Sequence, residues 1–144
     1  MPDRFDSFAS LAAALTEEED FRIRCLDRGS GTVILAPHGG TIEPQTKEIA
    51  EAIAGDRHSL YIFEALNPGQ HGELPITSHR FDEPRALALL AEARQAVAVH
   101  GRRDDGRADV WLGGRDEVLR DAIGQALRAA GFAATLGDRL PGLH

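Results

Sequence analysis

The stretch "TVILAPHGGTIEPQTKEIAEAIAG", residues 32–55, decides the fold that we predict for this chain. It opens with a continuous apolar and β-branched run over residues 32–36, which is typical of a strand that is covered on both faces of a sheet. Residues 44–55 then predict a helix, because Pro44 suits the first helical position and Gly55 suits the stop. We therefore expect a central strand that leads directly into a helix.

The rest of the chain continues the alternation of strands and helices. Further helices are expected after Ser7, from Pro84 with Asp82 or Glu83 as its cap, and near the carboxyl terminus. The pattern predicts one α/β domain over residues 1–144, with a mostly parallel or mixed sheet and helices on both faces. The expected strands are FRIRCL (21–26), SLYIFEAL (59–66), AVAVH (96–100), ADVWLGG (108–114) and FAATL (132–136), and the further helices are SFASLAAALTEEE (7–19), RALALLAEAR (85–94) and RDEVLRDAIGQALRAAG (115–131).

The composition bounds the classes of function. With 144 residues, 42% of them apolar, the chain has the size and the apolar content of one ordinary packed domain. Its formal charge of -7 argues against a general nucleic-acid or anionic-membrane binder, because neither polyanion is attracted to a net negative surface. No apolar run approaches the roughly 20 residues that span a bilayer, and no signal-peptide pattern opens the chain, so we expect a cytoplasmic protein. The single cysteine, Cys25, excludes an internal disulfide.

Two histidines stand at the ends of apolar strands. His38 follows the first strand quoted above, His100 ends the run AVAVH, and a glycine comes after each. Because ligands of α/β sheets gather at the carboxyl ends of strands, two neighbouring strands of this kind would aim both imidazoles at one crevice. Glu43 is the third member, since Pro44 holds it extended at a helix start that favours its ionised form. Two imidazoles and one carboxylate form the ligand set of catalytic zinc sites, although a single histidine at a strand end is more often a hydrogen-bonded loop residue.

The chain also carries a set of segments in a characteristic order and spacing: APHGGTIEPQTKEIAEAIAG, SLYIFEAL, LPITSHRFDEP, VAVHG, VWLGGRD and GF. In these segments it resembles the poly-gamma-glutamate hydrolase family, zinc amidohydrolases of bacteria and phages that are related in fold to the zinc carboxypeptidases. Some bacterial members carry a phage-replication label. The resemblance runs from about Phe8 to Phe132, and HGG-x-I-E-P with the later HG is its specific part. It implies a zinc-carboxypeptidase-like fold and a Zn²⁺ cofactor bound by His38, Glu43 and His100.

The resemblance further implies hydrolysis of a gamma-glutamyl amide bond in a small peptide or a poly-gamma-glutamate-like chain, with the metal polarising the carbonyl and activating the attacking water. By analogy with carboxypeptidases, residues 76–84 would lie near the site and hold the substrate. Arginine suits this task because its fork binds carboxylates in a bidentate manner, although a solvated loop charge is an equally common role. The implied substrate-binding residues are Ser78, His79, Arg80 and Arg102.

One family feature has no counterpart in the sequence. The family's general-base glutamate lies in a segment resembling G-V-Q-L-E near the carboxyl terminus, whereas this sequence ends at GDRLPGLH. We expect that a terminal segment is missing or that the chain is naturally short and lacks its base. Glu64, Asp82 and Glu83 are the carboxylates that could substitute, although the last two have a sufficient role as helix caps.

Three hypotheses on function follow. The first is a zinc-dependent amidohydrolase for gamma-glutamyl or related acidic bonds, which needs a basic cleft or a less charged substrate because the chain is net negative. The second is a metal-binding but catalytically impaired phage-derived remnant or partner-binding module. The third is a plain α/β interaction domain whose two loop histidines are unrelated, and this hypothesis predicts no stoichiometric metal.

Overall fold

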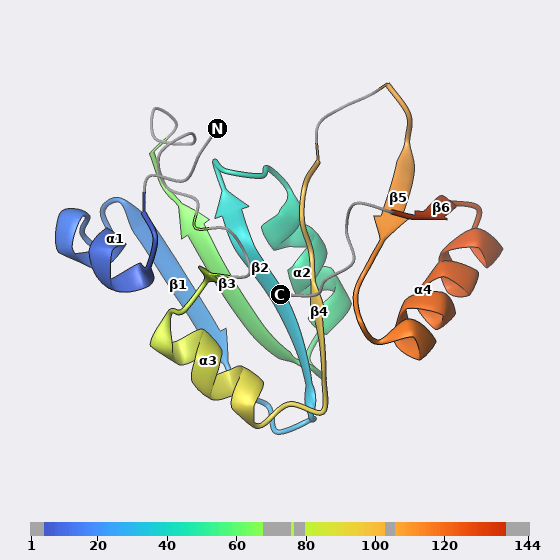
Figure 1. The fold of residues 1–144 in the computed structure, drawn as a ribbon, viewed down its shortest axis with the longest axis horizontal. Coiled ribbons are helices and arrows are strands. Elements are labelled where there is room, and N and C mark those ends of the chain that lie inside the picture. Colours follow the sequence, from blue (N-terminus) through green and yellow to red (C-terminus); the bar gives the residue numbers. More distant parts are fainter. Residues whose placement is uncertain (1–4, 68–75, 77–79, 103–105, 138–144) are drawn as a thin grey trace. The chain divides into compact units, whose positions relative to one another are not determined.

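The computed structural model describes residues 5–67, 76, 80–102 and 106–137. The chain forms two compact units, Met1–Arg102 and Arg103–His144, and the prediction of a single domain stays a prediction. The first unit contains α1 (Phe8–Ala14), β1 (Phe21–Leu26), β2 (Thr32–Gly40), α2 (Thr46–Ala54), β3 (Ser59–Ala65), α3 (Pro84–Ala91) and β4 (Gln95–Ala98), and the second contains β5 (Asp109–Leu112), α4 (Glu117–Ala129) and β6 (Ala133–Leu136) (Figure 1). Every helix and strand that the sequence predicts is therefore present, in the predicted order.

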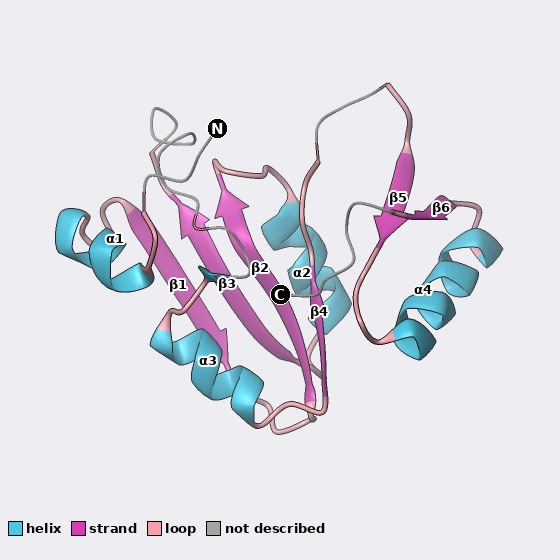
Figure 2. Cartoon of the chain, in the orientation of Figure 1, coloured by secondary structure: helices cyan, strands magenta, loops and turns pink. Residues whose placement is uncertain are grey.

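The first unit is built on a four-stranded mixed sheet in the order β1-β3-β2-β4 (Figure 2). β2 runs parallel to β3 on one side and to β4 on the other, and β1 runs antiparallel to β3 at the edge. The apolar run at the start of β2 thus occupies an inner strand, where residues 33–36 are all buried. This confirms the central strand that the sequence predicts.

Helices cover both faces of this sheet (Figure 1). Val33 and Leu35 point to the face that α1 and α3 cover, while Ile34 and Ala36 point to the face that α2 covers. The alternation follows from the two-residue period of a strand, and an apolar residue at every position serves both cores at once. The predicted mixed α/β architecture with helices on both faces is confirmed.

The junction between β2 and α2 differs from the prediction. α2 begins at Thr46, and its N-cap residue Gln45 has a left-handed backbone with φ of 75°. Both the backbone N–H and the hydroxyl of Thr46 donate to the Glu43 carbonyl oxygen, at 3.3 and 2.8 Å. The prediction that Pro44 takes the first helical position is therefore wrong, because this turn uses Pro44 and Gln45 before the helical hydrogen bonds begin.

The second unit pairs β5 and β6 in parallel and links them through α4. Asp116 caps α4, since its Oδ1 accepts a hydrogen bond from the Leu119 N–H at 3.0 Å. Among the residues that the structure describes, no helix has the length and the apolar character that crossing a bilayer requires.

Candidate metal centre

The two glycines after His38 let the chain turn back on itself. Gly40 has φ of 68°, and a Cβ atom there would collide with the carbonyl oxygen of Ala65 on β3. A Cβ on Gly39 would lie 2.9 Å from the carbonyl oxygen of Phe63. After this close approach the chain turns, and the Glu43 N–H donates to the His38 carbonyl oxygen at 2.9 Å. The glycines thereby bring Glu43 beside His38.

His100 completes the cluster from the neighbouring strand. It lies two residues beyond β4, which pairs in parallel with β2. The Glu43 Oε1 atom is 3.4 Å from Nδ1 of His38 and 3.3 Å from Nδ1 of His100. The two imidazole centroids are 5.2 Å apart, and one ligand atom from each of the three residues lies within 4.8 Å of the others. The structure thus brings together the three residues that the sequence singles out as metal ligands.

The other nitrogen of His38 identifies which atom faces the cluster. Nε2 of His38 lies 2.7 Å from the carbonyl oxygen of Ile76. Because a carbonyl oxygen can only accept a hydrogen bond, Nε2 must carry a proton. In the neutral imidazole, Nδ1 then presents a lone pair toward the negatively charged Glu43 oxygen. Two electron pairs that face each other need a cation between them, either a proton on the ring or a metal ion.

The distances between the ligand atoms fit a bound metal ion. A charged N–H···O bond is normally about 2.7–2.9 Å long, which is shorter than both separations from Glu43 Oε1. A tetrahedral zinc ion with bonds of about 2.0–2.1 Å holds its ligand atoms about 3.3–3.4 Å apart. The observed 3.4 and 3.3 Å match this spacing, so the donor set fits zinc.

The Glu43 carboxylate is held in its ionised form. Burial alone would raise the pKa of this carboxyl. Where the imidazoles are protonated, hydrogen bonds from His100 and His38 and the charge of His38, together with the Gly101 N–H, lower the pKa to about 2. The side chain of Glu43 is 21% exposed and that of His38 is 12% exposed, whereas His100 reaches 36%. The cluster is therefore open to solvent at His100, as a catalytic site with a free coordination position requires.

Comparisons with known proteins agree with this geometry. The sequence model of the poly-gamma-glutamate hydrolase family matches residues 5–144. The chain belongs to this family. The resemblance that the order and spacing of the segments indicate is thereby confirmed, and the matched range includes all three residues of the cluster.

Individual members of the family are similar over most of the chain. UPF0714 protein YmaC of Bacillus subtilis (strain 168) is 34% identical over 143 residues, which are 99% of this chain and 60% of YmaC. A structure of a bacteriophage poly-gamma-glutamate hydrolase matches with a TM-score of 0.93 and 31% identity, covering 97% of this chain and 69% of that chain. A zinc-free structure of YndL matches with a TM-score of 0.88 and 32% identity, covering 95% of this chain and 66% of that chain. The chain spans 47% of the length of UPF0714 protein YndL itself, so it corresponds to part of these relatives.

The residues expected to bind substrate are only partly described. Ser78 and His79 lie outside the described residues. Arg80 places Nη1 3.4 Å from Oδ1 of Asp6, in a pair whose side chains are 56% and 91% exposed. Arg102 is exposed two residues after His100 in the chain. Of this set, sequence proximity to the cluster is established for Arg102.

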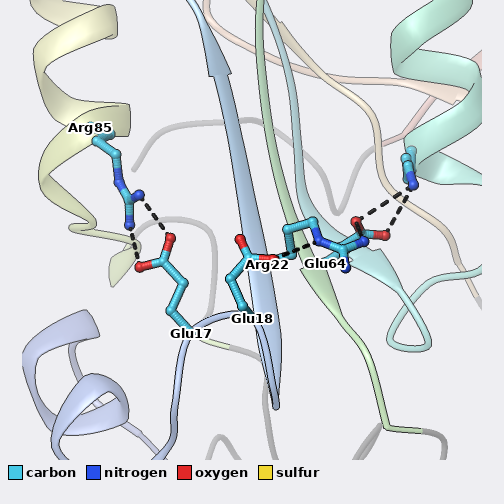
Figure 3. Close-up of polar contacts among 6 residues, drawn as sticks. Glu17, Glu18, Arg22, Glu64 and Arg85 are labelled. Carbon is cyan, nitrogen blue, oxygen red and sulfur yellow. Dashed lines mark hydrogen bonds and ion pairs between the residues drawn. The ribbon is translucent and has the colours of Figure 1, made fainter.

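The carboxylates considered as substitutes for the family's base have other partners. Glu64, on β3, lies 3.4 Å from Nη1 of Arg22 and 3.2 Å from Nζ of Lys47 (Figure 3). Oδ1 of Asp82 accepts a hydrogen bond from the Phe8 N–H at 2.6 Å. Glu83 caps α3 through the Ala86 N–H, as its sequence position predicts.

Two further residues contact the cluster through their main chains, and these contacts could not be predicted from the sequence. The Ile76 carbonyl orients His38, and the Gly101 N–H binds Glu43. Both contacts use main-chain atoms, which no side-chain pattern can reveal. Gly101 does have a signal, because it follows a candidate ligand, and a Cβ there would lie 3.2 Å from the Glu43 Cβ. Ile76 has none beyond its place in the family segment.

Proposed function

We propose that the protein binds one zinc ion through His38, Glu43 and His100 and hydrolyses gamma-glutamyl amide bonds of poly-gamma-glutamate or a related acidic peptide. The observation that carries this proposal is the position of one Glu43 carboxylate oxygen, which lies 3.4 Å from Nδ1 of His38 and 3.3 Å from Nδ1 of His100. Membership of the poly-gamma-glutamate hydrolase family supports the substrate class. The zinc-free description of the YndL structure supports the choice of metal.

Each residue of the cluster would have a distinct role in the proposed reaction. Both histidines would bind through Nδ1, and Glu43 would supply the charge that balances part of the metal's charge. When bound, zinc supplies Lewis-acid polarisation of the scissile carbonyl and activation of water. The exposed side of His100 leaves room for the substrate. A role for Glu64 or Asp82 in proton transfer would require the contacts with Arg22 and Lys47, or with the Phe8 N–H, to open.

The first test is metal content per chain. Protein purified without chelator or a metal-affinity tag is analysed for its elements, together with His38→Ala, His100→Ala and the control His58→Ala. We expect about one zinc per chain in the wild type and in His58→Ala, and loss of zinc in the other two variants. Hydrolysis of poly-gamma-glutamate is then measured on the same samples as release of shorter fragments.

The outcomes separate the hypotheses. Zinc binding and hydrolysis that disappear together in His38→Ala and His100→Ala support the proposed enzyme. Zinc binding without hydrolysis in the wild type supports the metal-binding, non-catalytic alternative. Absence of stoichiometric zinc after zinc is added back would overturn the proposal and leave a fold with two histidines that bind no metal.

A further inference from the structure

Ile76 makes contacts through both its side chain and its backbone carbonyl oxygen. Its side chain is 1% exposed and belongs to the apolar core between the sheet and the helices α1 and α3. Its carbonyl oxygen lies 2.7 Å from Nε2 of His38, at the short end of the range for an N–H···O hydrogen bond. One residue therefore connects the core to the candidate metal centre.

The core decides where this carbonyl lies. Burying an isoleucine side chain contributes more free energy than one neutral hydrogen bond does. The position of the Ile76 backbone is consequently set by the packing of its side chain, among neighbours such as Leu35 and Tyr61 in the same cluster, and not by His38. The carbonyl is thus a fixed acceptor to which the imidazole adjusts.

A fixed acceptor controls the imidazole in two ways. It keeps the proton on Nε2, and it limits rotation of the ring about its bond to the chain, so that Nδ1 stays directed at Glu43. The side chain of His38 is only 12% exposed, so few water molecules can replace the carbonyl as acceptor. Loss of this contact would leave the ligand present but poorly directed.

We propose that Ile76 is a positioning residue for the metal centre, which holds His38 through its core-anchored carbonyl so that Nδ1 is directed at the metal. The inference rests on the proposed zinc site and extends it to a residue that touches neither metal nor substrate. Partners of this kind that orient a metal ligand typically account for about 10–100-fold in metal affinity. Truncating the side chain should therefore weaken zinc binding although no ligand is removed.

The matched pair of variants is Ile76→Ala and Ile34→Ala. Both isoleucines are almost fully buried, at 1% and 2% exposure, but Ile34 belongs to the core on the opposite face of the sheet, against α2. Both truncations should lower the unfolding temperature of the metal-free protein. A merely structural role for Ile76 would affect stability alone, whereas a positioning role also affects the metal centre.

Two readouts are taken on each folded variant. Zinc affinity is measured by competition with a chromophoric chelator, and solvent exchange of the His38 Nε2–H proton is measured by NMR in the metal-free protein. We expect Ile76→Ala to bind zinc about 10–100-fold more weakly and to lose protection of this proton. Ile34→Ala should keep both properties. If Ile76→Ala does not fold, Ile76→Val replaces it, with a smaller loss in the same direction.

The results are decisive in either direction. Folded Ile76→Ala with wild-type zinc affinity and a protected Nε2–H would overturn the proposal, and so would an equal loss of affinity in Ile34→Ala. If the wild type binds no zinc, the proposed function fails, but the exchange measurement still tests the positioning role. Protection that is lost only on truncation of Ile76 then supports it.

Discussion

Glu43 and Glu64 occupy comparable places but have opposite surroundings. Each is a largely buried carboxylate near the carboxyl end of the sheet, at 21% and 11% side-chain exposure. Glu64 lies against Arg22 and Lys47, which carry a positive charge at any physiological pH (Figure 3). Glu43 lies against two imidazoles, which carry a positive charge only when they are protonated.

The difference separates a structural carboxylate from a candidate ligand. The charge of Glu64 is balanced by the protein itself, so this part of the fold is complete without any further ion. Around Glu43, imidazoles that are not protonated leave the negative charge unbalanced, and a cation, either a proton on a ring or a metal ion, balances it. A cluster of ionisable side chains is thus a candidate metal site when its neighbours are bases that bind metals, and a structural ion pair when they are permanent cations.

The exchange of each carboxylate for an amide tests this comparison most strongly. Glu43→Gln should lower the affinity for zinc by at least about 100-fold, since mutation of residues that only orient a metal ligand already lowers metal affinity by about 10–100-fold. Glu64→Gln should keep zinc but lose about 1–2 kcal/mol of stability, because Arg22 and Lys47, at 48% and 32% exposure, can turn partly to water.

Zinc affinity by chelator competition and the free energy of unfolding in urea check both variants. The comparison fails if Glu64→Gln also loses zinc or if Glu43→Gln keeps it. In the first case the two carboxylates would act as one network. In the second case the two imidazoles would bind zinc without a charged third ligand.

The turn between His38 and Glu43 provides the next test. Gly40→Ala forces a side chain into a conformation with φ of 68° and against the Ala65 carbonyl. We expect a loss of about 1–3 kcal/mol of stability and weaker zinc binding, since the turn that brings Glu43 to His38 shifts. Gly55→Ala is the control, because Gly55 also has positive φ but has no atom near the position of its Cβ. It should lose stability only, and equal weakening of zinc binding in both variants would contradict a local role for Gly40.

The pH dependence of Glu43 gives a third test. Its pKa in the folded protein is about 2, below the ordinary value of 4.5. A depressed carboxyl pKa contributes stability that is present above about pH 4.5 and is lost as the pH falls toward 2. The Glu43 carboxyl ¹³C resonance of the metal-free protein should therefore titrate near pH 2. In His38→Ala and His100→Ala the midpoint should rise, and an unchanged midpoint would show that the imidazoles do not hold the carboxylate.

Much of the fold could be predicted from the sequence because its signals are local. Ser7 caps α1 with its own side chain, Glu83 caps α3, and the apolar run of β2 is buried throughout, as their patterns indicate. The proximity of His38 and Glu43 could also be predicted, because the glycines between them indicate a tight turn. The left-handed Gln45 was not, since a glutamine carries no preference for that conformation.

The rest of the site depends on contacts between distant parts of the chain. His100 reaches Glu43 because β4 pairs with β2, and pairing order is a property of the whole sheet. The ion pairs of Glu64 arise from β1 and α2 together and cannot be predicted from the sequence, which offers Glu64 as a substitute base. The Ile76 carbonyl is invisible for a different reason, because every residue has one.

The smallest expected effect concerns a third charged pair, Arg80 with Asp6. This pair is exposed, unlike the ion pairs of Glu64, and it contains no imidazole, unlike the cluster around Glu43. Arg80→Ala should change stability by less than about 0.5 kcal/mol, because exposed ion pairs contribute little. If Arg80 instead binds a substrate carboxylate, the same variant should raise KM for a gamma-glutamyl substrate about 10-fold or more, the size of one lost charged hydrogen bond. Asp6→Asn is the matched control: it frees the arginine and should leave KM unchanged or lower. A large loss of stability in Arg80→Ala, with KM unchanged, would instead make this pair part of the fold, like that of Glu64.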